Sequence, residues 1–210
     1  MRVAIVLGWA SLVALGGLSM AADVPQAGVF SIDPAASHVV INVGRAGMLG
    51  FAGHDHAILA RGVTGRVTVD PADWQRCSVS LDFDTSSLEV SPAGEPPADV
   101  PEVQRVMLSD RVLDVKRFPV ILFRSRRVTG TRGSGQTALA IEGDLTLHGV
   151  KRPLTIHATV TPDAQGLTAR GSFSIRQTDF GIQPVTAGGG TVKVKDELDV
   201  QFQLAARRQE

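Results

Sequence analysis

Two histidines flank an aspartate in the segment GHDH, in a chain of 210 residues that has only five histidines. In extended backbone, His54 and His56 project to one side and Asp55 to the other. Two imidazoles on one face are the minimum for a Zn²⁺ or Cu²⁺ site, whereas a structural zinc needs four ligands and a catalytic zinc three plus water. His148 and His157 are candidate further ligands, but nothing in the sequence brings them near. Three interpretations stay open, namely a metal site, a contact with a ligand head group, and a hydrogen-bonded turn, and the ligand count leads us to assign no metal.

Other residues with catalytic potential lack the partners that catalysis needs. No GxSxG motif is present, so a nucleophile elbow is not expected. Arg176 and Asp179 lie three residues apart beside a Phe-Gly pair, which suggests a paired turn, although Arg176 could instead contact a phosphate head group. Cys77 is the only cysteine, and a buried free thiol is favoured over a reactive one. We therefore predict no catalytic residue, no cofactor and no enzymatic activity.

The elements that must position these groups are strands, because apolar and polar residues alternate along most of the chain. This period-2 pattern is typical of half-buried antiparallel strands. Short turn segments rich in Gly, Pro and Asp separate the strands. The strands are expected in these segments: 38–44, 63–70, 78–84, 120–125, 139–149, 154–160, 167–177 and 197–204. Eight evenly spaced strands predict a sandwich or a closed up-and-down barrel.

One long segment, residues 84–120, departs from the strand pattern. It begins with a Pro-rich acidic loop, and a helix is expected around residues 101–115. Pro101 and Glu102 suit a first helical turn. We expect this helical insertion to lie over one end of a barrel.

The first residues have the pattern of a secretory leader. Arg2 precedes an apolar run over residues 3–18, and Ser19 and Ala21 occupy the positions that a signal peptidase reads. We expect a signal peptide over residues 1–21, a single domain over residues 22–210, and a periplasmic or secreted protein. The 21 basic and 21 acidic residues balance, so neither nucleic acid nor an anionic membrane surface is an expected partner. Stable membrane insertion is not expected, and a homodimer is left open.

Small and large residues mix on the faces expected to point inward. Alanines and glycines stand among Val, Leu, Ile and Phe, at Ala158, Ala169, Gly65, Gly143 and Gly171. An eight-stranded barrel is either filled by its own side chains or holds one small ligand. The mixture leaves room for a slim apolar tail, and the alternative is a solid core in which glycines mark bulges.

Five segments resemble the YceI-like family, in the order expected for it. They are FSIDPAASHVVINV (30–43), LSDRVLDVKRFPVILFRS (108–125), IEGDLTLHGVKRPLTI (141–156), SIRQTDFGI (174–182) and VKDELDVQFQL (194–204). The resemblance implies an all-β, eight-stranded antiparallel lipocalin-like barrel with a short helical insertion. It also implies non-covalent binding of an isoprenoid or other long-chain lipid, of polyprenyl phosphate or quinone type, as a carrier or store in the periplasm.

On this basis we predict a lipid-binding wall and a head-group region. The expected head-group contacts are His54, Asp55, His56 and Arg176. The alternative function is a metal-dependent redox or stress protein that uses the GHDH segment. The predicted wall residues are Val39, Ile41, Val43, Phe51, Val67, Leu81, Phe83, Ile121, Phe123, Leu145, Leu147, Ile156, Phe173 and Phe202.

Overall fold

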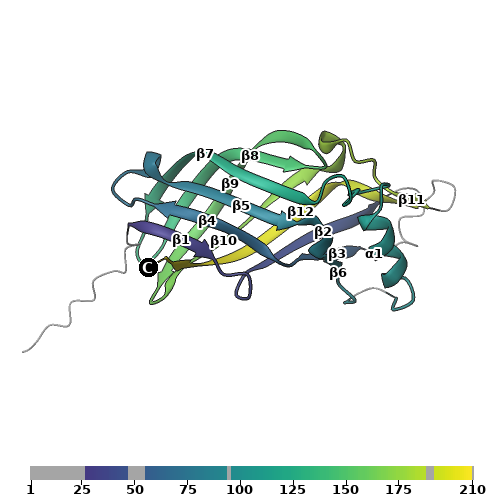
Figure 1. Cartoon of the computed structure of the whole chain (residues 1–210), viewed down its shortest axis with the longest axis horizontal. Coiled ribbons are helices and arrows are strands. Elements are labelled where there is room, and N and C mark those ends of the chain that lie inside the picture. Colours follow the sequence, from purple (N-terminus) through teal and green to yellow (C-terminus); the bar gives the residue numbers. More distant parts are fainter. Residues whose placement is uncertain (1–26, 47–54, 94–95, 188–191, 210) are drawn as a thin grey trace, which may run out of the picture.

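The computed structural model describes residues 27–46, 55–93, 96–187 and 192–209, and these residues form a strand-rich barrel with one α-helix (Figure 1). None of the described helices is long and apolar enough to cross a bilayer. Short 3-10 turns cover Trp74–Arg76, Thr85–Ser87 and Gln177–Phe180. The strands and the helix are β1 Gly28–Ile32, β2 His38–Ala46, β3 His56–Ala60, β4 Val63–Val69, β5 Ser78–Asp84, β6 Leu88–Val90, α1 Val100–Leu108, β7 Val120–Arg132, β8 Thr137–Leu147, β9 Val150–Asp163, β10 Gly166–Arg176, β11 Thr186–Ala187 and β12 Val192–Arg208.

The sheet closes on itself as an eight-stranded antiparallel barrel, as the sequence predicts. The order is β1-β4-β5-β7-β8-β9-β10-β12, and β12 pairs back with β1. Three staves of the barrel each consist of two strands separated by a short interruption. The strand β2 extends β1, β3 extends β4, and β6 extends β5. In the continued part β12 pairs with β2, β2 with β3, and β3 with β6.

Aspartate side chains that accept local hydrogen bonds fix two of these interruptions. Between β1 and β2, the Asp33 carboxylate accepts hydrogen bonds from the amides of Ala35 and Ala36 at 3.1 and 3.3 Å. Between β5 and β6, Asp84 accepts from the Ser86 amide at 2.9 Å and from its hydroxyl at 2.7 Å. These bonds lower the pKa of the Asp84 carboxyl below its ordinary value. A local side-chain bond of this kind lets the backbone leave the ladder and rejoin it.

The long insertion forms α1 and then a series of turns, so the helix is shorter than the predicted 101–115. It ends at Leu108 because the Ser109 hydroxyl donates to the carbonyl oxygen of Val106 at 2.7 Å. The chain then reverses through Asp114, whose φ is 43°. Turn chemistry thus ends the helix before the apolar pattern does.

The helix completes the barrel wall at the second edge of β6, with which no described strand pairs. Gln104 of α1 accepts a hydrogen bond from the Val90 amide at 2.7 Å and donates to the Leu88 carbonyl at 2.8 Å. These two bonds replace those that a neighbouring strand would make. Figure 1 shows α1 beside β6 at one end of the barrel, away from the C-terminus.

Two gaps between the expected strands are shorter in the structure, because the strands continue into them. The strand β7 runs to Arg132, with a bulge between Ser125 and Arg127 that changes which residues face inward. The bulge hides the continued strand from a period-2 pattern. Similarly, only His148 and Gly149 separate β8 from β9.

Candidate functional site

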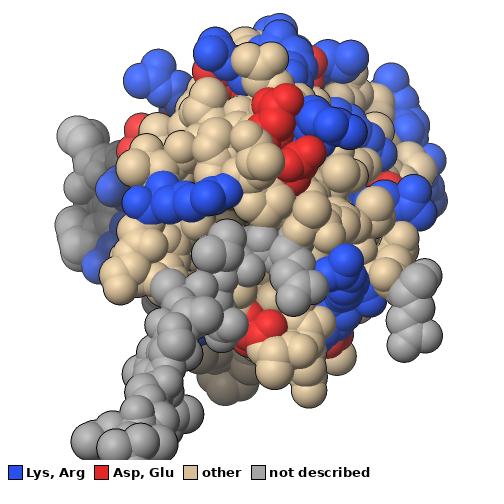
Figure 2. Space-filling model, turned by 90° about the vertical axis from the view of Figure 1, so that its left-hand side faces the viewer, with Lys and Arg blue, Asp and Glu red and all other residues tan. Residues whose placement is uncertain are grey.

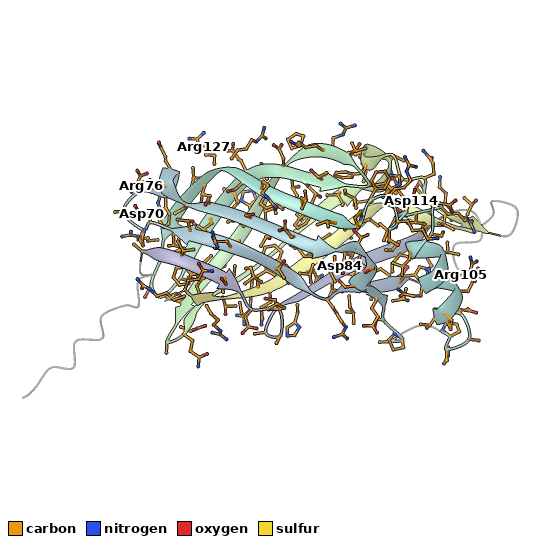
Figure 3. The ribbon with its side chains drawn as sticks, viewed as in Figure 1. Asp70, Arg76, Asp84, Arg105, Asp114 and Arg127 are labelled. Carbon is orange, nitrogen blue, oxygen red and sulfur yellow. The ribbon has the colours of Figure 1, made fainter. Side chains whose placement is uncertain are left out.

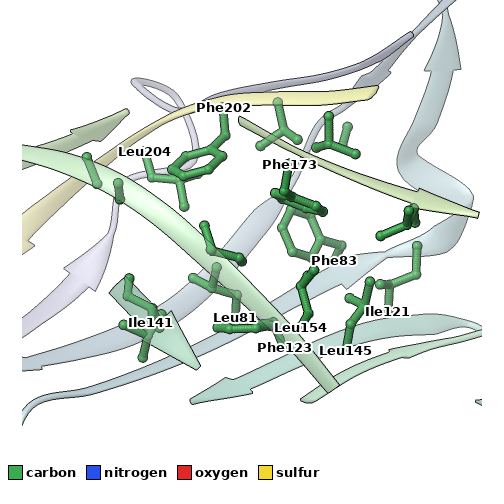
Figure 4. A pocket seen from close by; sticks show the side chains of 18 of the residues that line it. Leu81, Phe83, Ile121, Phe123, Ile141, Leu145, Leu154, Phe173, Phe202 and Leu204 are labelled. Carbon is green, nitrogen blue, oxygen red and sulfur yellow. The ribbon is translucent and has the colours of Figure 1, made fainter. Parts of the chain in front are cut away.

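An apolar tunnel runs inside the barrel, so the solid-core alternative is wrong. Its volume is about 260 Å³. Phe83, Phe173 and Phe202 point inward and remain only partly buried, which means that accessible space lies in front of them. Figure 4 shows labelled side chains from opposite walls facing one another across this space.

The tunnel is long and narrow. Its wall follows β10 from Leu167 to Ile175, a path of about 26 Å at about 3.3 Å per residue. A strand tilt of about 40° reduces this to about 20 Å along the barrel axis. The volume lies just below the usual range of about 300–1,000 Å³ for ligand pockets. The shape therefore suits a slim chain better than a broad ring system.

Two glycines let aromatic rings lie against the wall. A Cβ on Gly143 would lie 2.7 Å from the Phe123 ring, and a Cβ on Gly171 would lie 2.7 Å from the Phe202 ring. Phe202 also contacts Phe173, with ring centroids 6.4 Å apart. The glycines thus do not open the tunnel as the sequence suggests, because rings occupy the space beside them.

One end of the tunnel is lined by Trp74 and Cys77. The Arg132 guanidinium lies 5.6 Å from the Trp74 ring centroid and donates to the Pro71 carbonyl, which holds the 3-10 turn across this end. The Cys77 thiol donates to the Asp70 carbonyl at 3.5 Å. Burial raises the pKa of the Cys77 thiol, and the carboxylates of Asp70 and Asp73 add to this effect.

The opposite end is lined by the insertion and by the 3-10 turn after β10. Met107 of α1 and Leu113 of the following turns are both buried and face the tunnel. Gln177, at the start of the 3-10 turn, is 5% exposed and also lines the tunnel. Its amide nitrogen donates to the Lys195 carbonyl at 2.8 Å.

Charged side chains lie on the outside of the barrel. Among the described residues, no Lys, Arg, His, Asp or Glu lines the tunnel. Figure 2 shows basic and acidic side chains together around one end of the molecule. Many of them pair, such as Arg124 with Asp82 at 2.5 Å and Arg76 with Asp70 at 3.5 Å, the latter at one end of the barrel in Figure 3. A buried charge needs a compensating partner, so the tunnel favours uncharged atoms.

Thirteen of the fourteen predicted wall residues line the tunnel, and Phe51 lies outside the described residues. They lie on strands where inward and outward side chains alternate regularly, and their contact with a lipid stays a prediction. The thirteen are Val39, Ile41, Val43, Val67, Leu81, Phe83, Ile121, Phe123, Leu145, Leu147, Ile156, Phe173 and Phe202.

None of the expected head-group residues that the structure describes lines the tunnel. Asp55 is exposed and accepts a hydrogen bond from the Arg45 amide at 3.0 Å. His56 begins β3 and His54 lies outside the described residues. Arg176 is exposed and absent from the tunnel wall. Within the described ranges, no three His, Cys, Asp or Glu side chains group as metal ligands would.

The expected Arg176–Asp179 pair is replaced by another contact. Asp196 accepts from the Thr178 amide at 2.9 Å and from its hydroxyl at 2.7 Å, and these bonds lower the pKa of the Asp196 carboxyl. The sequence interpretation missed Gln177, although the alternation along β10 continues from Ile175 to this residue. A polar residue at an inward position is the signal that could have identified it.

Comparisons with known proteins agree with this architecture. The family model described as YceI-like domain matches residues 30–206. A UPF0312 protein from Pseudomonas putida (strain W619) is 28% identical over 196 residues, covering 90% of this chain and 93% of that protein. A Vibrio cholerae UPF0312 protein is 32% identical over 143 residues, covering 65% and 68%.

Solved structures share the fold. BcnA of Burkholderia cenocepacia superposes with a TM-score of 0.63 at 20% identity, over 82% of this chain and 98% of BcnA. A polyisoprenoid binding domain from Saccharophagus degradans gives a TM-score of 0.62 at 13% identity, over 88% of this chain and all of that domain. At these identities the likeness supports the fold.

Proposed function

The chain belongs to the YceI-like family, and from this premise we propose that it binds an isoprenoid or other long-chain lipid non-covalently inside its barrel. The observation that carries the proposal is a tunnel of about 260 Å³ with an almost wholly apolar wall. The polyisoprenoid binding domain of Saccharophagus degradans, which has the same fold, supports it further.

The tunnel wall supplies affinity through buried area. Each CH₂ group that moves from water into such a tunnel contributes about 0.8 kcal/mol. Ten buried carbons would contribute about 8 kcal/mol before the entropy cost of binding is subtracted. A tail of a few isoprene units therefore needs few polar contacts to bind tightly.

We propose a role as a carrier or store in the periplasm, with residues 1–21 as the export signal. A non-covalent carrier needs an apolar interior and a soluble outer face. Charged pairs on the outer face, such as Arg124 with Asp82, meet the second need. The described tunnel wall contains no pair of acid and base side chains for chemistry on a bound lipid.

Extraction of the purified protein with organic solvent, followed by mass spectrometry, tests the proposal. A lipid that co-purifies in a constant ratio to protein is the expected result. The stripped protein is then titrated with geranylgeraniol, a C20 isoprenoid alcohol, with Trp74 fluorescence as the signal because Trp74 lines the tunnel. Failure of both, with no extracted lipid and no binding of the alcohol, would overturn the proposal.

A further inference from the structure

Among the described residues, Gln177 is the polar residue that lines the tunnel at the end where the insertion and α1 lie. The residue is 5% exposed and begins the 3-10 turn that follows β10. The nitrogen donates to the Lys195 carbonyl at 2.8 Å, so the amide cannot be flipped without placing two oxygens together. The oxygen Oε1 must therefore point away from β12.

No described group donates a hydrogen bond to Gln177 Oε1. Among the described residues, the only fully enclosed side-chain oxygen without a partner is Thr85 Oγ1. Gln177 Oε1 therefore keeps accessible surface, and the residue that carries it lines the tunnel. A buried acceptor that lacks a donor costs free energy until a ligand supplies one.

We propose that Gln177 selects the lipid head group: Oε1 accepts a hydrogen bond from a hydroxyl of an uncharged lipid, such as an isoprenoid alcohol or a phenol. The proposal rests on the proposed function, because it requires a lipid in the tunnel. A phosphate or carboxylate head is disfavoured, since its negative charge would be buried where the described wall offers no cation.

The opposite end of the tunnel offers a weaker alternative. Thr137 is 4% exposed and lines the tunnel near Trp74. Its hydroxyl can rotate and is both a donor and an acceptor, so it imposes no fixed requirement on a ligand. The Gln177 amide is held in place by its bond to the Lys195 carbonyl, so its acceptor Oε1 and the second hydrogen of Nε2 have fixed positions.

The test uses three C20 probes that share one tail: geranylgeraniol, its methyl ether and its monophosphate. Dissociation constants are measured by calorimetry for the wild type, Gln177→Leu and Thr137→Val. The wild type is expected to bind the alcohol about tenfold more tightly than the ether, which cannot donate. The monophosphate is expected to bind at least about tenfold more weakly than the alcohol.

In Gln177→Leu the alcohol and the ether should bind equally, while Thr137→Val should keep the wild-type preference. Equal binding of alcohol and ether by the wild type would overturn the inference, as would loss of the preference in Thr137→Val alone or tighter binding of the monophosphate. If none of the probes binds, the proposed function itself fails. Should Gln177→Leu not fold, the wild type and Thr137→Val still decide between these outcomes.

Discussion

Filling the tunnel from one wall should weaken lipid binding without unfolding the barrel. Ala169 of β10 faces the tunnel and is only partly buried, so a larger side chain here enters existing space. Ala169→Leu adds three carbon atoms, which displace about three carbons of a bound tail. At about 0.8 kcal/mol per carbon, the loss is about 2.4 kcal/mol. This corresponds to an increase in Kd of about 50-fold.

The matched control is Thr159→Leu on β9, because Thr159 is exposed on the outer face of the neighbouring strand. Both variants are titrated with geranylgeraniol, and thermal melts confirm that both remain folded. The control should bind as the wild type does. An unchanged Kd in folded Ala169→Leu, or an equal loss in both variants, would refute the idea that the tail passes this part of the wall.

Three further predictions concern the two ends of the barrel. Because burial raises the pKa of Cys77, iodoacetamide should alkylate this thiol more slowly at pH 8 than it alkylates free cysteine. Bound geranylgeraniol should slow the reaction further, since Cys77 lines the tunnel. A rate equal to that of free cysteine would contradict this prediction. Gln104→Leu removes both hydrogen bonds to the edge of β6, so the free energy of unfolding measured in urea should fall by about 2 kcal/mol. The control Glu102→Gln, on the exposed face of α1, should leave this free energy nearly unchanged. The Thr178 bonds lower the pKa of Asp196 in the folded state, so the stability that they contribute is present above the ordinary carboxyl pKa and is lost as the pH falls through the lowered pKa. Thr178→Val removes the hydroxyl bond and should therefore reduce the drop in Tm between pH 5 and pH 2. An undiminished drop in Tm would count against this account.

The sequence predicts the barrel because its strands are regular, and it fails where side chains interrupt that regularity. The segment 78–84 was predicted with the bounds of β5, since polar and apolar residues alternate through all of it. The strand β6 has only three residues, and β3 is apolar at four consecutive positions, so neither shows a period-2 pattern. The place of β6 depends on the break fixed by Asp84 and on Gln104 of α1. Such long-range bonds leave no periodic signal in the sequence.

The candidate site shows the same division. Alternation alone places Val39, Phe83 and Phe173 in the tunnel wall, because one face of every strand in a closed barrel points inward. Alternation does not predict whether the interior is hollow, since that depends on the positions of the phenylalanine rings inside the barrel. Phe202 lies against the wall only because Gly171 leaves space for its ring, a contact between residues 31 positions apart.

A hollow barrel must obtain its stability away from its centre. Inward-facing Phe83, Phe173 and Phe202 keep accessible surface, so the chain forgoes part of the burial that a solid core would give. The backbone hydrogen bonds between strands offset this loss of burial, because the pairing of β1 with β12 closes the barrel and leaves the main strands without free edges. A bound tail would then restore the missing burial, and it would stabilise the fold by about 2.7 kcal/mol at a concentration of 100 Kd. Binding and folding are thus linked through the same apolar surface, which is why an inward substitution such as Ala169→Leu can weaken the first while leaving the second intact.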